Sequence, residues 1–146
     1  MTIKVVFQLE RNEDGYPPIA VEMLNAKALG GGLFLIQNTP FFTENVSYHD
    51  VVKASATDVQ GQQSFDELVE QSDFTALSII ILDESMDTFL MDLLRGLSCV
   101  IEYGEFSVYR VLAVAVPATT DYATLRGVLQ SLEDRELISF SELAVG

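Results

Sequence analysis

The sequence has few of the residues that build cross-links and metal centres. Its 146 residues include one cysteine, Cys99, one histidine, His49, and no tryptophan. A lone cysteine cannot form an intramolecular disulfide, and one cysteine with one histidine supplies too few ligands for a structural zinc site. We therefore expect a fold that holds without cross-links, and we expect no metal and no cofactor.

Basic residues and long apolar runs are scarce as well. Eight Lys and Arg residues stand against 22 Asp and Glu residues, which gives a formal net charge of −14. Nucleic acids and anionic membrane surfaces repel such a chain, so neither is an expected partner. The apolar run Ile79–Leu82 is far shorter than the roughly 20 residues that span a bilayer. Because the first residues also lack the pattern of a secretory signal, the expected location is the cytoplasm.

Hydrophobic residues make up 49% of the chain, which is enough for a packed core. The apolar residues of the segment 3–9 recur with the period of two that is typical of a half-buried strand. In the next strand, Val21 and Met23 are expected to share a face with Ile19. Further strands are predicted at 33–36, 50–56 and 64–71. Residues 64–71 also fit helical spacing, but the glycine-containing turn before them favours a strand. Five short strands predict a small curled antiparallel sheet or barrel over residues 1–71.

Residues 72–146 alternate between strand and helix patterns. Strands are predicted at 76–82, 99–103, 108–116 and 138–143, with helices that begin after the caps Ser85 and Asp121. The hairpin between the second and third strands is expected at Gly104. This order of elements is that of a ferredoxin-like βαββαβ unit, and its most apolar strands, the first and third, should lie in the centre of the sheet. The predicted fold class is α+β, with a barrel-like domain at 1–71 and a ferredoxin-like domain at 72–146.

Acidic residues concentrate in one part of the chain. Residues 66–105 contain ten acidic residues and one basic residue, Arg95, which is a net charge of −9. We expect these carboxylates to crowd one flank of the fold around the first helix. The acids at 83–87 lack the alternating ligand pattern of a calcium loop, and their place at a helix start fits the helix dipole.

Two apolar features also suggest a binding surface. Met91 lies off the apolar stripe of the first helix among polar and charged neighbours, as in partner-binding surfaces, although it can equally face the other half of the molecule. Phe42 and Tyr16 are aromatic residues beside turns that could anchor a partner, and the alternative is a hydrophobic contact between the two halves. The residues predicted to bind a partner are Asp83, Glu84, Asp87, Met91, Asp92, Glu102, Glu105, Phe42 and Tyr16.

The segment Asn38-Thr39-Pro40-Phe41-Phe42 carries an Asn-x-Pro-Phe-Phe motif. With this motif the chain resembles the bacterial domain-of-unknown-function family 4265, whose members have a similar length. His49 takes the place of the glycine in the family's Gly-Asp-Val-Val pattern, and residues 73–78 lack the Gly and the Arg of its Gly-x-Ser-Thr-x-Arg run. The resemblance implies a bacterial origin and a shared fold, and it brings no activity with it.

No set of residues has the spacing of a catalytic site. His49 and Asp50 are adjacent, and adjacent residues of a strand point to opposite faces, so a turn histidine is the preferred interpretation. The run Gly30-Gly31-Gly32 precedes a strand and no lysine follows it, which favours a hairpin over a phosphate-binding loop. Cys99 lies next to apolar residues, as a buried structural thiol does. We predict that the protein is not an enzyme.

These observations favour an acidic, non-enzymatic binding protein. The preferred hypothesis is an immunity protein that neutralises a cognate basic bacterial toxin, such as a nuclease, by occluding its active site or an exosite. Concentrated negative charge accelerates association with a cationic protein and resembles the phosphate backbone that a nuclease binds. The alternative is a small-ligand-binding or regulatory ferredoxin-like module, which rests on fold analogy. The sequence leaves the oligomeric state open.

Overall fold

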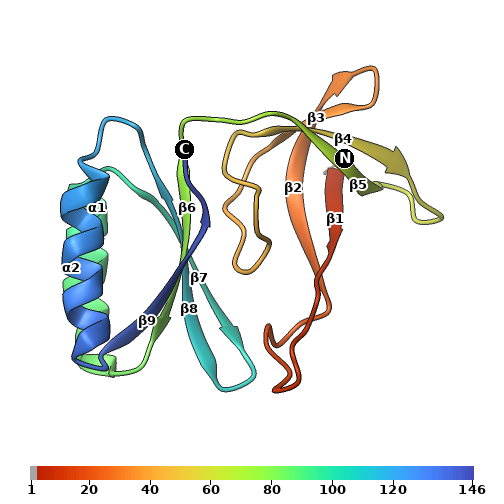
Figure 1. The fold of residues 1–146 in the computed structure, drawn as a ribbon. Coiled ribbons are helices and arrows are strands. Elements are labelled where there is room, and N and C mark those ends of the chain that lie inside the picture. The colour runs from red at the N-terminus through yellow and green to blue at the C-terminus, as the bar shows by residue number, and fades with distance from the viewer. Residues whose placement is uncertain (1–2) are drawn as a thin grey trace.

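The computed structural model describes residues 3–146, and its first half is a closed five-stranded barrel (Figure 1). The strands are β1 (Ile3–Gln8), β2 (Val21–Gly30), β3 (Leu33–Ile36), β4 (Val51–Ala56) and β5 (Gln62–Glu70). Consecutive strands pair antiparallel, and β1 closes the barrel by pairing parallel with β5. The predicted N-terminal barrel is confirmed, and so is the strand interpretation of residues 64–71.

The barrel follows from local sequence signals. Residues 30–32 adopt φ values of 92°, 65° and 79°, a region that glycine occupies without steric cost, and they form the tight hairpin between β2 and β3. In β1 the alternating pattern buries Val5 and Phe7 as expected. In β2, however, Val21 and Met23 are exposed, and the alternate residues Glu22 and Leu24 are buried instead. Val21 and Met23 therefore share a face as predicted, and that face is the exposed one.

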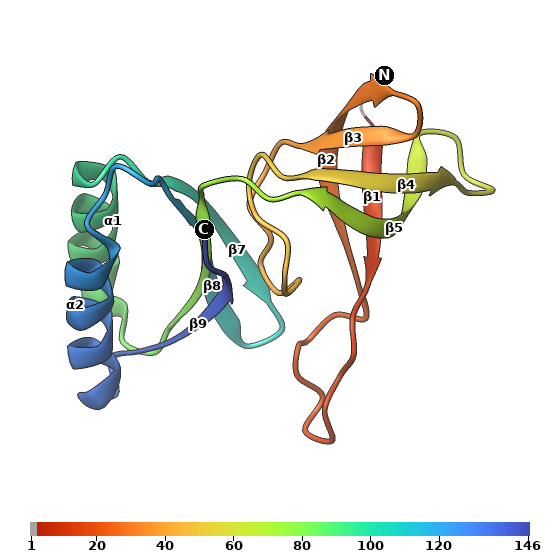
Figure 2. The ribbon, with the colours of Figure 1, turned by 45° about the horizontal axis from the view of Figure 1, so that its top comes forward.

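The second half is an antiparallel four-stranded sheet with two helices on one face (Figures 1 and 2). Its elements are β6 (Thr75–Ile81), α1 (Asp87–Gly96), β7 (Val100–Phe106), β8 (Tyr109–Val116), α2 (Tyr122–Asp134) and β9 (Ile138–Ala144). The strand order is β7-β8-β6-β9, so the two most apolar strands, β6 and β8, are central as predicted. The fold is α+β with an N-terminal barrel. Neither α-helix in the described part of the chain has the length and hydropathy needed to cross a membrane.

The start of the first helix differs from the prediction. A 3-10 turn, Glu84–Met86, precedes α1, and its cap is Asp83. The Asp83 carboxylate accepts hydrogen bonds from the Ser85 N–H at 2.9 Å and from the Ser85 hydroxyl at 2.7 Å. Ser85 is therefore a donor to the cap and not the cap itself. The prediction for α2 is confirmed, because Asp121 accepts a hydrogen bond from the Thr124 N–H at 3.2 Å.

Gly104 lies inside β7, and the hairpin turn after it consists of Ser107 and Val108. The prediction of a turn at this glycine is wrong. A Cβ on Gly104 would lie 2.6 Å from Phe106 Cε2 and 3.0 Å from Phe41 Cζ. The missing side chain therefore leaves room for two aromatic rings on the face of the sheet that is turned towards the barrel.

A second hydrophobic core lies between the sheet and the two helices. Leu90 and Leu94 of α1, with Leu125 and Leu129 of α2, are buried against the apolar side chains of β6 and β8. Cys99 is half-buried and packs against this core. Its partial burial raises the pKa of the thiol to about 11, because the protein interior disfavours the thiolate.

We predict that Cys99 of the native chain reacts slowly with thiol reagents. A shift of the thiol pKa from 9.0 to about 11 lowers the thiolate fraction at pH 8 roughly a hundredfold. The rate with dithionitrobenzoate should therefore be roughly a hundredfold lower for the native chain than for the urea-unfolded chain at that pH. The raised pKa also links folding to pH. The stability that the neutral, partly buried thiol contributes is complete below pH 9.0 and is lost as the pH rises towards 11, because the unfolded chain then ionises more readily. Equal rates in the two states would contradict the burial of this thiol.

Candidate functional site

Residues 37–50 connect β3 to β4, and this segment lies between the barrel and the sheet (Figure 1). We refer to this segment as the clamp loop. Its Asn45 N–H donates to the Leu143 carbonyl of β9 at 2.8 Å. Its Ser47 hydroxyl donates to the Phe74 carbonyl at 2.9 Å. These two hydrogen bonds help to hold the clamp loop against the second half.

Glu22 of β2 holds the motif segment of the clamp loop. Its buried carboxylate accepts hydrogen bonds from the backbone N–H groups of Phe41 at 2.6 Å, Phe42 at 3.1 Å and Thr43 at 2.9 Å. The Thr43 hydroxyl donates a fourth hydrogen bond at 2.6 Å. A buried carboxylate is costly unless several donors replace its water, and here four donors do so. This carboxylate fixes the backbone of the segment that carries the two adjacent phenylalanines.

Asp50 holds the other end of the clamp loop. This residue is fully buried, and its two oxygens accept hydrogen bonds from the Ser47 N–H at 2.9 Å and the Ser72 N–H at 2.7 Å. The Ser72 hydroxyl in turn donates to the Tyr48 carbonyl at 2.6 Å. Asp50 therefore connects the clamp loop to the segment between β5 and β6 and has a structural role.

His49 is a turn residue, as the sequence predicted. Its φ is 67°, its ring is exposed, and it stacks on Tyr48 with ring centroids 3.8 Å apart. A positive φ explains why a glycine is suited to this position. The neighbouring Asp50 carboxylate is hydrogen-bonded to serine backbone N–H groups, and no hydrogen bond or ion pair joins it to His49.

Phe42 and Tyr16 lie in an aromatic contact between the two halves. Phe42 is 6% exposed, and its ring packs edge-on against Tyr16 at 5.7 Å and Phe106 of β7 at 5.0 Å. Tyr16 also contacts Tyr109 of β8 at 5.7 Å, and Phe41 contacts Phe106 at 4.9 Å. Burial, followed by the nearby Tyr109, raises the pKa of Tyr16. The prediction of Phe42 as an exposed anchor is wrong, and the alternative of a hydrophobic contact between the halves is what the structure shows.

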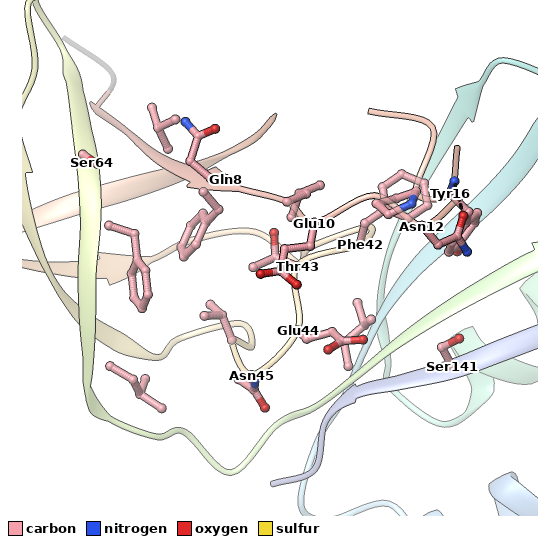
Figure 3. A pocket seen from close by; sticks show the side chains of 18 residues that line it. Gln8, Glu10, Asn12, Tyr16, Phe42, Thr43, Glu44, Asn45, Ser64 and Ser141 are labelled. Carbon is pink, nitrogen blue, oxygen red and sulfur yellow. Dashed lines mark hydrogen bonds between the residues drawn. The ribbon is translucent and has the colours of Figure 1, made fainter. Parts of the chain in front are cut away.

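A groove of about 780 Å³ opens beside this contact, between β1, β5, the clamp loop and β9 (Figure 3). We refer to it as the barrel groove. Its apolar lining consists of Val6, Phe7, Leu9, Pro17, Phe42, Val46, Phe65, Leu68 and Leu143. Figure 3 shows Gln8 and Glu10 approaching from the β1 side, Thr43 to Asn45 from the clamp loop and Ser141 from β9.

The barrel groove is charged at two positions, and both are acidic. Glu10 and Glu44 are exposed lining residues, and none of the described residues that line the groove is Lys, Arg or His. The sequence contained no signal for this pair, because Glu10 follows β1 and Glu44 belongs to the clamp loop. Only the folding of the clamp loop across the end of the barrel brings them to one groove.

The predicted acidic residues lie in separate places. Asp83, Glu84 and Asp92 are exposed at the start of α1 and along it. Glu102 of β7 faces the clamp loop, where it accepts a hydrogen bond from the Asn38 amide at 3.4 Å. The acidic residues of β5, at positions 66, 67 and 70, belong to the barrel, on the opposite side of the molecule from α1 (Figure 1). The expectation of one acidic flank is wrong.

A small polar network covers the end of the sheet near α1. Arg110 forms an ion pair with Asp87 and donates to the Tyr103 hydroxyl at 3.3 Å. The Tyr103 hydroxyl in turn donates to Glu105 at 2.8 Å. These contacts, first the one to Tyr103 and then the one to Asp87, raise the pKa of Arg110. Asp87 thus contacts the guanidinium directly, and Glu105 is linked to it through the Tyr103 hydroxyl.

Met91 is half-buried and packs against the core between the sheet and the helices. It does not lie on an outer acidic face, so the interpretation of Met91 as a partner contact is wrong. Among residues 3–146, no group of three or more His, Cys, Asp or Glu side chains is placed to hold a metal ion.

The barrel groove is the candidate site, because it combines an apolar floor with carboxylates at its edge.

We predict that Glu22→Gln destabilises the fold by about 2–4 kcal/mol, because an amide cannot accept all four hydrogen bonds and points donors at N–H groups. Urea unfolding of the full chain measures this loss. The matched control is Glu70→Gln, at an exposed position of β5, which should change the free energy of unfolding by less than about 0.5 kcal/mol. Equal stability of the two variants would show that the Glu22 carboxylate does not hold the clamp loop.

Comparisons with known proteins support a shared fold. A crystal structure of a hypothetical protein from Neisseria gonorrhoeae matches with a TM-score of 0.80 and 26% sequence identity, and covers 99% of this chain and 94% of that protein. No curated protein matches the chain. The family described as "Domain of unknown function (DUF4265)" matches residues 22–140, which include the clamp loop, Glu22 and Asp50. On this match, the chain belongs to the DUF4265 family.

Proposed function

We propose that this protein is an acidic, non-enzymatic binding protein whose partner is a basic protein. More specifically, we propose an immunity protein that neutralises a cognate basic bacterial toxin, such as a nuclease, by occluding the toxin's active site or an exosite. The net charge of −14 supports this proposal, because it accelerates association with a cationic protein and opposes association with nucleic acids and anionic membranes.

The observation that carries the proposal is the composition of the barrel groove. An apolar floor, with Glu10 and Glu44 as its charged lining residues, offers both a surface to bury and a charge that selects a basic partner. The exposed acids Asp83, Glu84 and Asp92 at α1 form a second acidic surface. In this proposal the groove makes the contact, and the acids at α1 contribute to attraction over longer distances.

We propose that the protein acts in the bacterial cytoplasm. The similarity to a protein from Neisseria gonorrhoeae supports a bacterial origin. We also propose that residues 1–71 and 72–146 are the two domains, since β5 ends at Glu70 and β6 begins at Thr75. The strand order β7-β8-β6-β9 with both helices on one face supports a ferredoxin-like arrangement for the second domain.

The second candidate function is binding of a small molecule. The volume of the barrel groove, about 780 Å³, lies within the usual range of ligand pockets, about 300–1,000 Å³. A ligand that fits would raise the melting temperature, because it binds the native state alone. A thermal-shift screen of metabolites therefore distinguishes this function from binding of a protein.

We predict that the chain protects a bacterial host from a basic toxin domain encoded beside it. Co-expression with the C-terminal domain of the neighbouring secreted protein should restore growth that this domain alone inhibits. The affinity of the purified pair should fall at least about tenfold between about 0.05 M and 0.5 M salt, because salt screens the attraction between opposite charges.

An uncharged osmolyte at matched osmolality is the control for the salt series, and it should leave the affinity unchanged. Absence of protection and of binding at low salt would contradict the proposal. A metabolite that stabilises the chain, together with that failure, would favour the second function.

A further inference from the structure

The barrel is closed over only a short length. β1 and β5 pair at three positions, Lys4–Gln62, Val5–Gln63 and Val6–Ser64, although β5 continues to Glu70. β4 pairs along the other edge of β5 from Gln63 to Glu70, with two register shifts. Within residues 3–146, no strand pairs with the groove edge of β5 from Phe65 to Glu70. The backbone N–H and C=O groups of this edge are available to an added strand.

Side chains close the gap where backbone pairing stops. The rings of Phe7 and Phe65 contact each other with centroids 4.8 Å apart, and both line the barrel groove. Leu68 also lines the groove and is 38% exposed, and the adjacent Val69 is 50% exposed. An unpaired strand edge with exposed apolar residues is a preferred place for another chain to pair.

The charges around this edge select the chain that can pair there. β5 carries exposed carboxylates at positions 66, 67 and 70, and Glu10 and Glu44 line the groove next to it. Lys53 of β4 lies opposite Glu67 in register and partly compensates that one carboxylate. A second copy of this chain, with its net charge of −14, is repelled from such an edge, whereas a segment rich in Lys or Arg is attracted to it.

We propose that the barrel groove binds an extended basic segment of the partner protein, which adds a strand to the free edge of β5. Alternate apolar side chains of this segment pack on Phe7, Phe65 and Leu68, and its basic side chains lie near Glu10 and Glu44. This inference rests on the proposed function, since it identifies the part of the basic partner that is bound and the strand that binds it.

The experiment uses a fluorescent peptide of about eight residues with alternating Lys and Val, which matches the length of an ordinary strand. Its affinity for the full chain is measured by anisotropy at low salt. We expect the double variant Glu10→Lys/Glu44→Lys to weaken binding about tenfold, because two attractions become repulsions. The matched control is Glu84→Lys/Asp92→Lys, which changes the net charge by the same four units at α1 and should weaken binding less than about threefold.

Two further peptides test strand addition and charge. Consecutive N-methyl groups in the centre of the Lys-Val peptide remove the N–H groups of both its edges and should abolish binding. Replacement of Lys by Glu in the peptide should also abolish binding. Equal binding of the N-methylated peptide would overturn strand addition, and equal binding of the Glu-Val peptide would overturn selection by charge.

Other outcomes overturn the inference and leave the proposed function standing. If the α1 control pair weakens binding more than the groove pair does, the basic segment docks at α1 instead. If sedimentation shows a dimer of this chain that Val69→Lys dissociates, the free edge of β5 binds a second copy. If the Lys-Val peptide does not bind at all while the chain still protects a host from its toxin, the partner docks by another surface.

Discussion

The carboxylate of Glu22 is the contact on which the arrangement of the two halves depends. It points from β2 into the interior and accepts four hydrogen bonds from Phe41, Phe42 and Thr43. These bonds set the backbone of the clamp loop so that the rings of Phe41 and Phe42 reach Phe106 on the sheet. The groove between barrel and sheet exists because this loop is held across the end of the barrel. A buried charge with this many donors restricts the loop, because a loop conformation that withdraws these donors leaves the carboxylate unpaired.

Much of the fold could be predicted from the sequence, because its signals are local. The Gly30–Gly32 hairpin, the central position of the apolar strands β6 and β8, and the Asp121 cap each follow from neighbouring residues. The errors occur where tertiary contacts override local preference. Gly104 resembles a turn residue but makes room for Phe41 and Phe106 inside a strand.

The candidate site was less predictable than the fold. In β2, the exposed face carries Val21 and Met23, whereas the buried face carries Glu22, whose carboxylate holds the clamp loop. Glu10 and Glu44 lie far apart in the sequence, and no local pattern joins them. Acidic residues that are close in the sequence are also not close in the structure. Those of residues 66–105 lie on the barrel, on α1 and on the face of β7 that meets the clamp loop. The aromatic contact of Phe42 with the sheet was among the alternatives that the sequence offered, and so was the turn position of His49.

In the proposed function, the division of acidic residues separates two roles that one acidic flank would have combined. A net charge of −14 acts on a distant partner whatever its detailed placement, because long-range attraction depends on total charge. Specific contact requires an apolar surface, and the barrel groove is where carboxylates adjoin one. The unpaired edge of β5 adds backbone hydrogen bonds to that surface. The barrel groove thus combines carboxylates that attract a basic segment, an apolar surface that can be buried and backbone groups that can accept an added strand.

The most direct test of this account is hydrogen–deuterium exchange of the full chain with and without the Lys-Val peptide. Strand addition predicts slower exchange at residues 65–70 of β5, accompanied by protection at residues 42–46 of the clamp loop, and unchanged exchange along α1. Protection confined to α1, or saturating binding that leaves residues 65–70 unprotected, would contradict the assignment of the barrel groove as the binding site.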